Sequence, residues 1–199
     1  MQSAEAVIHI HEDNWMMRNL YPLSTAAEVE ADIAAGAAFG EQHRHPSGIG
    51  YNAIRMTEPP ASTYADVGLR LADVASRIEP LLPRVRRFYA TISGAIGQAR
   101  RDPFGSYEED AWAFGTGRHC YIKLEVDGEL VTHIWYDLFG ATTEEMGRLN
   151  AAFQAIHALA PSILADHFAD AAIPVGDEPA LTSYFDSLHA HYERISQSP

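Results

Sequence analysis

The sequence predicts an α+β fold, with a mainly antiparallel sheet and helices packed on one side, as a single domain over residues 1–199. The expected segments run strand, helix, strand, helix, several strands and then helices, an order typical of α+β proteins. Two β-rich runs flank Asp127-Gly128, a dipeptide that favours a tight antiparallel hairpin. The chain has 199 residues, 47% of them hydrophobic, which suffices for one full-sized core.

The first segments combine a short strand with a helix. Residues 6–11 (AVIHIH) are expected to form a strand, and residues 12–24 an irregular connection. A helix is expected from Ser24 or Thr25, because Glu28 has the spacing of a capping-box acid. The apolar stripe of this helix is Val29, Ile33 and Ala37.

The next segments repeat this order. Residues 48–57 (GIGYNAIRMT) alternate as a strand does, and a second helix is expected from Ser62 or Thr63 to Leu81. Its apolar stripe is Val67, Leu71, Val74, Ile78 and Leu82. Residues 86–94 (RRFYATISG) read as another strand. A long loop with charged and aromatic side chains is expected from there to residue 110.

The clearest local pattern is the hairpin at residues 120–137 (CYIKLEVDGELVTHIWYD). A two-residue turn at Asp127-Gly128 places Val126 opposite Glu129. The further pairs expected are Leu124 with Val131 and Ile122 with His133. On this register the core face consists of Cys120, Ile122, Leu124, Val126, Val131, His133 and Trp135. A strand containing Trp112 and Phe114 is expected before the hairpin.

The last third of the chain is predicted to be helical. Thr142-Thr-Glu-Glu opens a helix that runs to Pro161, with Leu149, Phe153 and Ile156 as its stripe. Residues 162–170 (SILADHFAD) are expected to form a shorter helical piece. The final helix begins near Glu178-Pro179, since proline is tolerated in a first turn. Its expected buried side is Leu181, Tyr184, Phe185, Leu188, Tyr192 and Ile195.

The charge of the chain restricts its partners. The formal net charge is −13, and Lys123 is the only lysine. Such a surface repels phosphate backbones, so no nucleic-acid partner is expected. It favours solubility, and it also favours association with a protein that has a basic surface. The arginines of RVRRF (Arg84, Arg86, Arg87) are expected to protect a sheet edge or to pair with acids of the same molecule.

The sequence also indicates a compartment. The N-terminal residues lack the basic and apolar regions of a secretory signal, and no apolar stretch reaches the ~20 residues of a membrane helix. Cys120 is the only cysteine and lies in an apolar pattern, so it reads as a small buried hydrophobe. A cytoplasmic protein without a membrane partner is therefore expected.

Two histidines near the N-terminus could hold a metal ion. In a strand His9 and His11 point to the same face, and Glu12 or Asp13 could add an oxygen ligand. The stretch VIHIH resembles the His-x-His motif at the end of the first strand in amidohydrolase-type metal-dependent hydrolases. That resemblance implies a small metal-dependent hydrolase with these residues as ligands. The competing interpretation is a half-exposed strand with apolar residues inward and histidines outward, and it requires no metal or other cofactor.

The function favoured by the sequence is protein binding without catalysis. The expected loops carry exposed aromatic and acidic side chains, which are common in protein contact surfaces. The contact residues predicted there are Trp15, Tyr107, Glu108, Glu109 and Asp110. Bacterial toxin-immunity proteins are similar in size and acidity, so the hypothesis is a protein that recognises and blocks a partner. Self-association into a homo-oligomer through the apolar loop residues is a further alternative.

Overall fold

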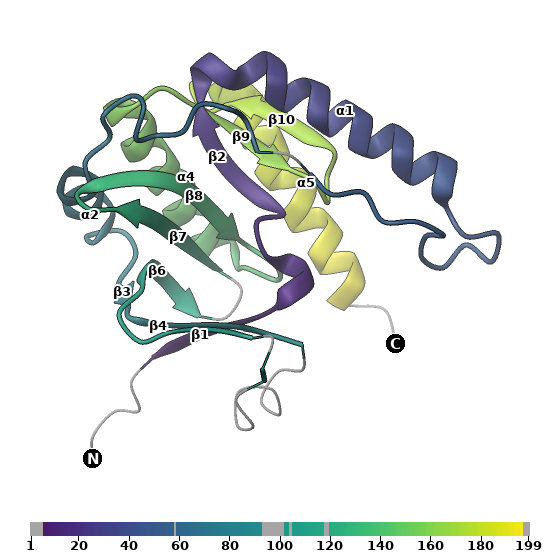
Figure 1. The fold of residues 1–199 in the computed structure, drawn as a ribbon, viewed down its shortest axis with the longest axis horizontal. Helices are drawn as coiled ribbons and strands as arrows, with labels where there is room; N and C mark the ends of the chain where they lie inside the picture. Colours follow the sequence, from purple (N-terminus) through teal and green to yellow (C-terminus); the bar gives the residue numbers. More distant parts are fainter. Residues whose placement is uncertain (1–5, 58, 93–101, 104, 118–119, 197–199) are drawn as a thin grey trace.

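A seven-stranded sheet forms the centre of the computed structural model, which describes residues 6–57, 59–92, 102–103, 105–117 and 120–196 (Figure 1). The strand order is β10-β9-β2-β8-β7-β6-β3, and the pairings in the described part of the chain are antiparallel. The strands are β2 (Arg18–Pro22), β3 (Arg84–Val85), β6 (Trp112–Gly117), β7 (Cys120–Asp127), β8 (Leu130–Asp137), β9 (Ser162–Asp166) and β10 (Ala171–Pro174). The predicted α+β class and mainly antiparallel sheet are confirmed.

A smaller sheet covers one end of the large one. β1 (Val7–His11) runs parallel to β4 (Arg87–Thr91), and β5 (Ser106–Glu108) runs antiparallel to β4. The predicted strand over residues 6–11 is thus confirmed. The apolar side chains that pack between the two sheets include Ile8, Ile10, Phe88, Tyr121 and Trp135. They hold the N-terminal strand against the hairpin.

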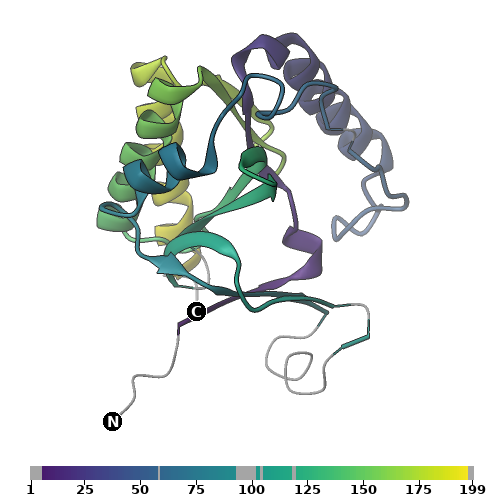
Figure 2. The same ribbon diagram turned by 60° about the vertical axis from the view of Figure 1, so that its left-hand side comes forward.

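The helices enclose the rest of the large sheet. α2 (Leu71–Ile78), α4 (Thr143–Leu159) and α5 (Glu178–Ser196) pack on one face, as expected, and Figure 2 shows them together. α1 (Ala26–His43) lies against the other face at the β9 and β10 end. The side chains buried there are Tyr21, Val29, Ile33, Ile163 and Ala165. Within the described residues, no helix combines the length and apolarity needed to cross a membrane.

The start of α4 follows its sequence pattern closely, whereas the start of α1 does not. The Thr142 side chain accepts from the Glu145 backbone N–H, and the Glu145 carboxylate accepts from the Thr142 N–H at 2.9 Å. The predicted capping box at Glu28 is wrong, because Thr25 donates instead to the carbonyl of Pro22 and Glu28 accepts from the N–H of Ala61. Both helices nevertheless begin within two residues of the expected positions.

The prediction of an irregular connection over residues 12–24 is wrong. Residues 18–22 form β2, which pairs with both β8 and β9 and is buried along its whole length. The short 3-10 turns η1 (Glu12–Asn14) and η2 (Leu23–Thr25) flank it. A strand is compatible with this sequence because Pro22 lies at the strand end and the charge of Arg18 is neutralised by carboxylates.

The helical prediction for residues 162–170 is also wrong. Residues 162–166 form the buried strand β9, and β10 follows it. A short apolar run fits a strand buried on both faces as well as a helix. Ile163 packs toward α1 and Leu164 toward α4 and α5, so both faces of β9 are covered.

Three other predicted boundaries need correction. Residues 48–57 form no strand, and only an isolated bridge joins Tyr51 to Arg44. The second helix is limited to α2, because residues 63–68 form turns that end at Gly68 with a φ of +72°. Of the predicted strand over residues 86–94, residues 87–91 form β4, while β3 lies just before it and belongs to the large sheet. β5 lies in the expected loop. The part of that loop at residues 93–101 and 104 lies outside the described residues.

The predicted hairpin forms, but its register is wrong. Asp127 pairs with Leu130, so the turn residues are Gly128, with a φ of +58°, and Glu129. A bulge between Glu125 and Val126 then shifts the ladder further. The resulting pairs are Val126 with Val131, Leu124 with Ile134 and Ile122 with Tyr136. Ile134 and Tyr136 therefore face the helices, while Trp135 faces the small sheet.

Candidate functional site

The predicted acidic contact residues are paired with basic side chains of the same molecule. Glu108 lies 3.0 Å from the buried ammonium of Lys123. Glu109 lies 3.2 Å from the Arg87 guanidinium. The Asp110 carboxylate contacts Arg84 at 3.3 Å and Arg86 at 3.2 Å. The arginines of RVRRF thus pair with two members of the acidic triplet Glu108-Glu109-Asp110, which is one of the two roles expected for them, and Lys123 pairs with the third.

The two predicted aromatic contacts lie on different sides of the small sheet. Trp15 stacks on Trp135 with ring centroids 5.5 Å apart, and it packs against the apolar cluster between the sheets. Tyr107 lies beside Tyr89 at 5.1 Å, on the outer face of β4 and β5. Both rings are half-buried. The structure does not gather these five predicted residues into one patch.

The histidines of β1 have different surroundings. His9 is buried, and its Nε2 lies 2.7 Å from the hydroxyl of Thr91. His11 is exposed, and its Nδ1 lies 3.3 Å from the carboxylate of Asp13. Glu12 and Asp13 belong to η1, directly after the strand. Among the described residues, no group of three or more His, Cys, Asp or Glu side chains is arranged to hold a metal ion.

The single thiol is buried as expected. Cys120 is 3% exposed and packs in the main core. Burial, with a contribution from the Glu145 carboxylate, raises the pKa of the Cys120 thiol to about 11. The thiol is therefore protonated at neutral pH and serves as core.

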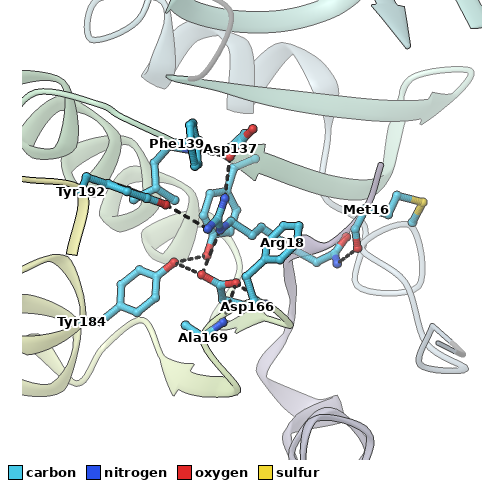
Figure 3. Close-up of polar contacts among 12 residues, drawn as sticks. Met16, Arg18, Asp137, Phe139, Asp166, Ala169, Tyr184 and Tyr192 are labelled. Atoms are coloured by element: carbon cyan, nitrogen blue, oxygen red, sulfur yellow. Dashed lines mark hydrogen bonds and ion pairs between the residues drawn. The ribbon is translucent and has the colours of Figure 1, made fainter. Parts of the chain in front are cut away.

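A buried ionic network lies between the sheet and α5 (Figure 3). Nε of Arg18 donates to Asp166 at 2.9 Å, and its terminal nitrogens donate to Asp137 at 2.6 Å and to the Tyr192 hydroxyl at 3.1 Å. The Tyr184 hydroxyl donates to Asp166 at 2.8 Å. We call these residues the Arg18 cluster: Arg18, Asp137, Asp166, Tyr184 and Tyr192.

The two carboxylates of the Arg18 cluster also accept hydrogen bonds from backbone N–H groups. Asp166 accepts backbone N–H groups of Phe168 and Ala169 through its second oxygen, at 2.8 and 3.2 Å. Asp137 accepts the N–H of Leu138 at 2.8 Å. Burial alone lowers the pKa of Arg18, but Asp166, Tyr192 and Asp137 together raise it above its ordinary value. The cluster therefore stays charged and fastens the ends of β2, β8 and β9 to α5.

A pocket of about 380 Å³ lies on the opposite face of β2 and β9. α1 forms one wall, and the segment after it returns across the opening with Arg55, Pro59 and Pro60. Arg55 forms an ion pair with Asp32 of α1. We call this cavity the Asp32 pocket, and it is lined by Tyr21, Glu28, Val29, Ala31, Asp32, Ile33, Ala35, Arg55, Pro59, Pro60, Ala165 and His167.

Two polar groups in the Asp32 pocket lack hydrogen-bond partners within the described part of the chain. Tyr21 is 9% exposed and lines the pocket, where its hydroxyl is close enough to Asp32 to be affected by the charge of that carboxylate. The side chain of His167 is also 9% exposed, and its Nε2 lies 3.9 Å from Oδ2 of Asp32, too far for a direct hydrogen bond. Burial, with a contribution from Asp32, raises the pKa of Tyr21 to about 12, and burial lowers the pKa of His167 below its ordinary value. Both groups are therefore neutral at pH 7 and available to a ligand.

The segment beside this pocket exposes large apolar side chains. Ile49, Ile54 and Met56 are 83%, 89% and 81% exposed, and Tyr51 is 60% exposed. The segment that carries them projects beyond the sheet together with the C-terminal half of α1 in both views (Figures 1 and 2). We call residues 44–57 with α1 the arm. A soluble domain rarely exposes so many large apolar groups in so short a segment unless they contact something.

Sequence reasoning missed the residues that the structure gathers on the faces of β2 and β9. Arg18 and Tyr21 fell in the expected irregular connection, and Asp166 and His167 in the expected helix. One signal was present, because Asp32 lies next to Ile33 and three residues after Val29, on the edge of an apolar stripe. An acid in that position is a candidate for a partly buried ion pair.

Comparisons with known proteins give no further guidance. No protein-family model, no curated protein and no solved structure matches this chain. The functional conclusion therefore depends on the geometry of the chain itself.

Proposed function

We propose that this protein binds a partner protein with a basic surface and blocks it, in the manner of a bacterial toxin-immunity protein. The observation that carries the proposal is the arm, where the most exposed large apolar side chains among the described residues lie within eight positions. Apolar anchors of this kind supply most of the binding energy in protein interfaces. The arm is therefore the primary contact surface.

The net charge of the arm supports a basic partner, because its acids outnumber Arg44 and Arg55, which pair with Glu41 and Asp32. α1 contains Glu28, Glu30, Asp32 and Glu41, and it contains no lysine or arginine. Glu30 is exposed on this helix. A negative helix beside exposed apolar groups favours rapid and selective association with a positively charged protein. The net charge of −13 acts in the same direction over longer distances.

The contacts predicted from the sequence take a secondary place in this proposal. A partner that used Glu109 or Asp110 would have to displace Arg87, Arg84 or Arg86 from them. Trp15 would have to leave its stack on Trp135 to contribute its full surface. The arm requires no such rearrangement, since its apolar side chains are already exposed.

The proposal includes a location in the cytoplasm. The chain has a single, buried cysteine, so it forms no internal disulfide. Proteins of oxidising compartments often depend on disulfides, and cytoplasmic ones rarely do. A cytoplasmic partner with a basic surface is the counterpart that this composition suits.

Affinity capture in the source cell tests the proposal with three variants of the full chain. The arm variant is Ile49→Ser/Ile54→Ser/Met56→Ser, and the charge variant is Glu109→Gln/Asp110→Asn. The control is Val67→Ser/Ile195→Ser, which removes exposed apolar groups elsewhere. We expect one basic protein to be captured by wild type and control and lost with the arm variant.

Purified components then decide whether the capture is specific. The affinity for the recovered protein should fall as salt rises, and the protein's activity should fall when it is bound. If the arm variant still captures the partner and the charge variant does not, the contact surface is the acidic triplet instead of the arm. Failure to recover any stoichiometric partner, or recovery of only a second copy of this chain, would contradict the proposed function.

A further inference from the structure

The Asp32 pocket presents hydrogen-bond acceptors that converge on a small volume. Oδ2 of Asp32 and Nε2 of His167 are 3.9 Å apart and are not bonded to each other. Tyr21 lines the same cavity, and the charge of Asp32 contributes to the raised pKa of its hydroxyl. Asp32 uses Oδ1 for its ion pair with Arg55, so Oδ2 is directed to His167 and the pocket. A group that carries several N–H donors would satisfy all three atoms at once.

The charge of the pocket favours a cation. Asp32 and Glu28 each carry a negative charge, Arg55 carries a positive one, and Tyr21 and His167 are neutral at pH 7. The formal charge of the described lining is therefore negative by one unit. An anionic ligand would be repelled by two carboxylates, and the cationic side chain among the described lining residues is already paired with Asp32. A single positive charge balances the lining.

The remaining walls are apolar and narrow. Val29, Ile33 and Ala165 form them from α1 and β9, and Pro59 and Pro60 cover the side. At about 380 Å³ the cavity is near the lower end of the range typical of small-molecule sites. A short aliphatic chain matches these walls. A planar aromatic ligand finds no aromatic face here besides Tyr21 in the described lining.

We propose that the Asp32 pocket binds a primary ammonium group on a short aliphatic chain. The ammonium donates to Oδ2 of Asp32, to Nε2 of His167 and to the Tyr21 hydroxyl, and the chain lies along the apolar walls. An ammonium has three donors and no acceptor, which matches three acceptors and one net negative charge. His167 accepts in the tautomer that carries its proton on Nδ1. The ligand is either a free alkylamine or the lysine side chain of another protein, and this inference does not depend on the protein-binding function.

The test is an NMR titration of the full-length protein with four probes. n-Butylamine is the cationic ligand, n-butanol is its neutral counterpart, and butyrate is its anionic counterpart. Nα-acetyl-lysine methylamide presents the same ammonium on a peptide unit. We expect saturable shifts of Tyr21, Asp32 and His167 with n-butylamine, with a Kd on the order of 1 mM. n-Butanol should bind at least about tenfold more weakly, and butyrate should give no saturation.

Variants distinguish binding of n-butylamine in the pocket from its general attraction to an acidic protein. Asp32→Asn should weaken n-butylamine binding at least about tenfold, because it removes the charge that the ammonium balances. Tyr21→Phe and His167→Gln keep the Arg55–Asp32 ion pair, and they cover the case in which Asp32→Asn disturbs the segment after α1. Each should weaken binding about three- to tenfold. Glu30→Gln removes an exposed charge of the same helix and should leave the affinity unchanged.

The results of the titration either identify the ligand or overturn the proposal. Binding of n-butylamine alone identifies a free amine as the ligand, and equal binding of the lysine derivative identifies a lysine side chain. Equal affinities for n-butylamine and n-butanol would overturn the proposal. So would equal weakening by Asp32→Asn and Glu30→Gln, or the absence of saturable shifts in the pocket with every probe.

Discussion

Two sets of polar side chains lie on opposite faces of β2 and β9, and they differ in how far their members are bonded to one another. In the Arg18 cluster, one cation is held by two carboxylates and a tyrosine, and both carboxylates also accept backbone N–H groups. In the Asp32 pocket, Tyr21 is buried and His167 is partly buried, and neither side chain has a hydrogen bond within the described chain. The comparison indicates that the first set maintains the fold and that the second is open to a ligand.

The burial of these groups determines how strongly the difference affects stability and ligand binding. A buried charge that loses its partner costs several kcal/mol, so the ionic network of the Arg18 cluster resists change. A hydroxyl or imidazole nitrogen that lines a cavity without a hydrogen bond to the protein is available to a ligand that can bond it. Neighbouring residues of the same strands thus differ in function because of the face to which they point.

The largest effect is expected from Arg18→Met. The substitution keeps the aliphatic volume but leaves Asp137 and Asp166 buried without their cation. We expect the free energy of unfolding at pH 7 to fall by about 3–5 kcal/mol, measured by urea denaturation. Arg70→Met is the control, because its ion pair with Glu129 is exposed, and it should cost no more than about 1 kcal/mol. Equal effects of the two substitutions would contradict a supporting role of the Arg18 cluster.

A smaller loss is expected from Tyr184→Phe. Its hydroxyl donates to Asp166 at 2.8 Å and lies 2.9 Å from that of Tyr136, so the substitution leaves both groups short of a partner. The free energy of unfolding should fall by about 1–3 kcal/mol. A loss within the error of the urea measurement would show that these hydrogen bonds are replaceable.

Tyr21→Phe is the matched substitution on the other face and should have a still smaller effect. Tyr21 is nearly as buried as Tyr184, at 9% against 7% exposed, but its hydroxyl has no hydrogen bond within the described residues. The free energy of unfolding should change by no more than about 0.5 kcal/mol. A loss as large as that of Tyr184→Phe would mean that the Tyr21 hydroxyl already stabilises the fold.

The smallest expected effect is on the pH dependence of stability. Burial lowers the pKa of His167 below its ordinary value of 6.5, with Asp32 opposing the change, so the unfolded chain binds a proton more readily than the native one. Stability from this group is present above the ordinary pKa and is lost as the pH falls through the native pKa. Between about pH 7.5 and about pH 5.5, the wild type should therefore lose more stability than His167→Gln. Identical losses would show that His167 is not held neutral by the fold.

The parts of the fold that follow from local pattern were predictable from the sequence. α4 and α5 were expected because their apolar stripes repeat at helical spacing, and the hairpin because a glycine turn joins two β-rich runs. Its register was not predictable, since the choice of turn residues and the bulge near Val126 depend on packing against both faces. Likewise, β9 is a short apolar run whose strand form depends on α1 and α4 covering it.

Local sequence patterns could not predict the two polar sets either, because their members come from distant parts of the chain. Arg18 and Asp166 are 148 positions apart, and they meet only because β2 and β9 pair. Asp32 and His167 likewise come from α1 and the end of β9. Local spacing therefore favoured the pair His9 and His11, whose members are two positions apart in sequence but have different surroundings in the structure.

The most direct test of the contrast between the two faces is n-butylamine binding by the two phenylalanine variants, Tyr21→Phe and Tyr184→Phe. The Tyr21 variant should bind the amine about three- to tenfold more weakly than wild type at unchanged stability, and the Tyr184 variant should bind it as wild type does while it unfolds more readily. Unchanged binding by the Tyr21 variant, or a comparable loss in both, would contradict the assignment of one face to the fold and the other to a ligand.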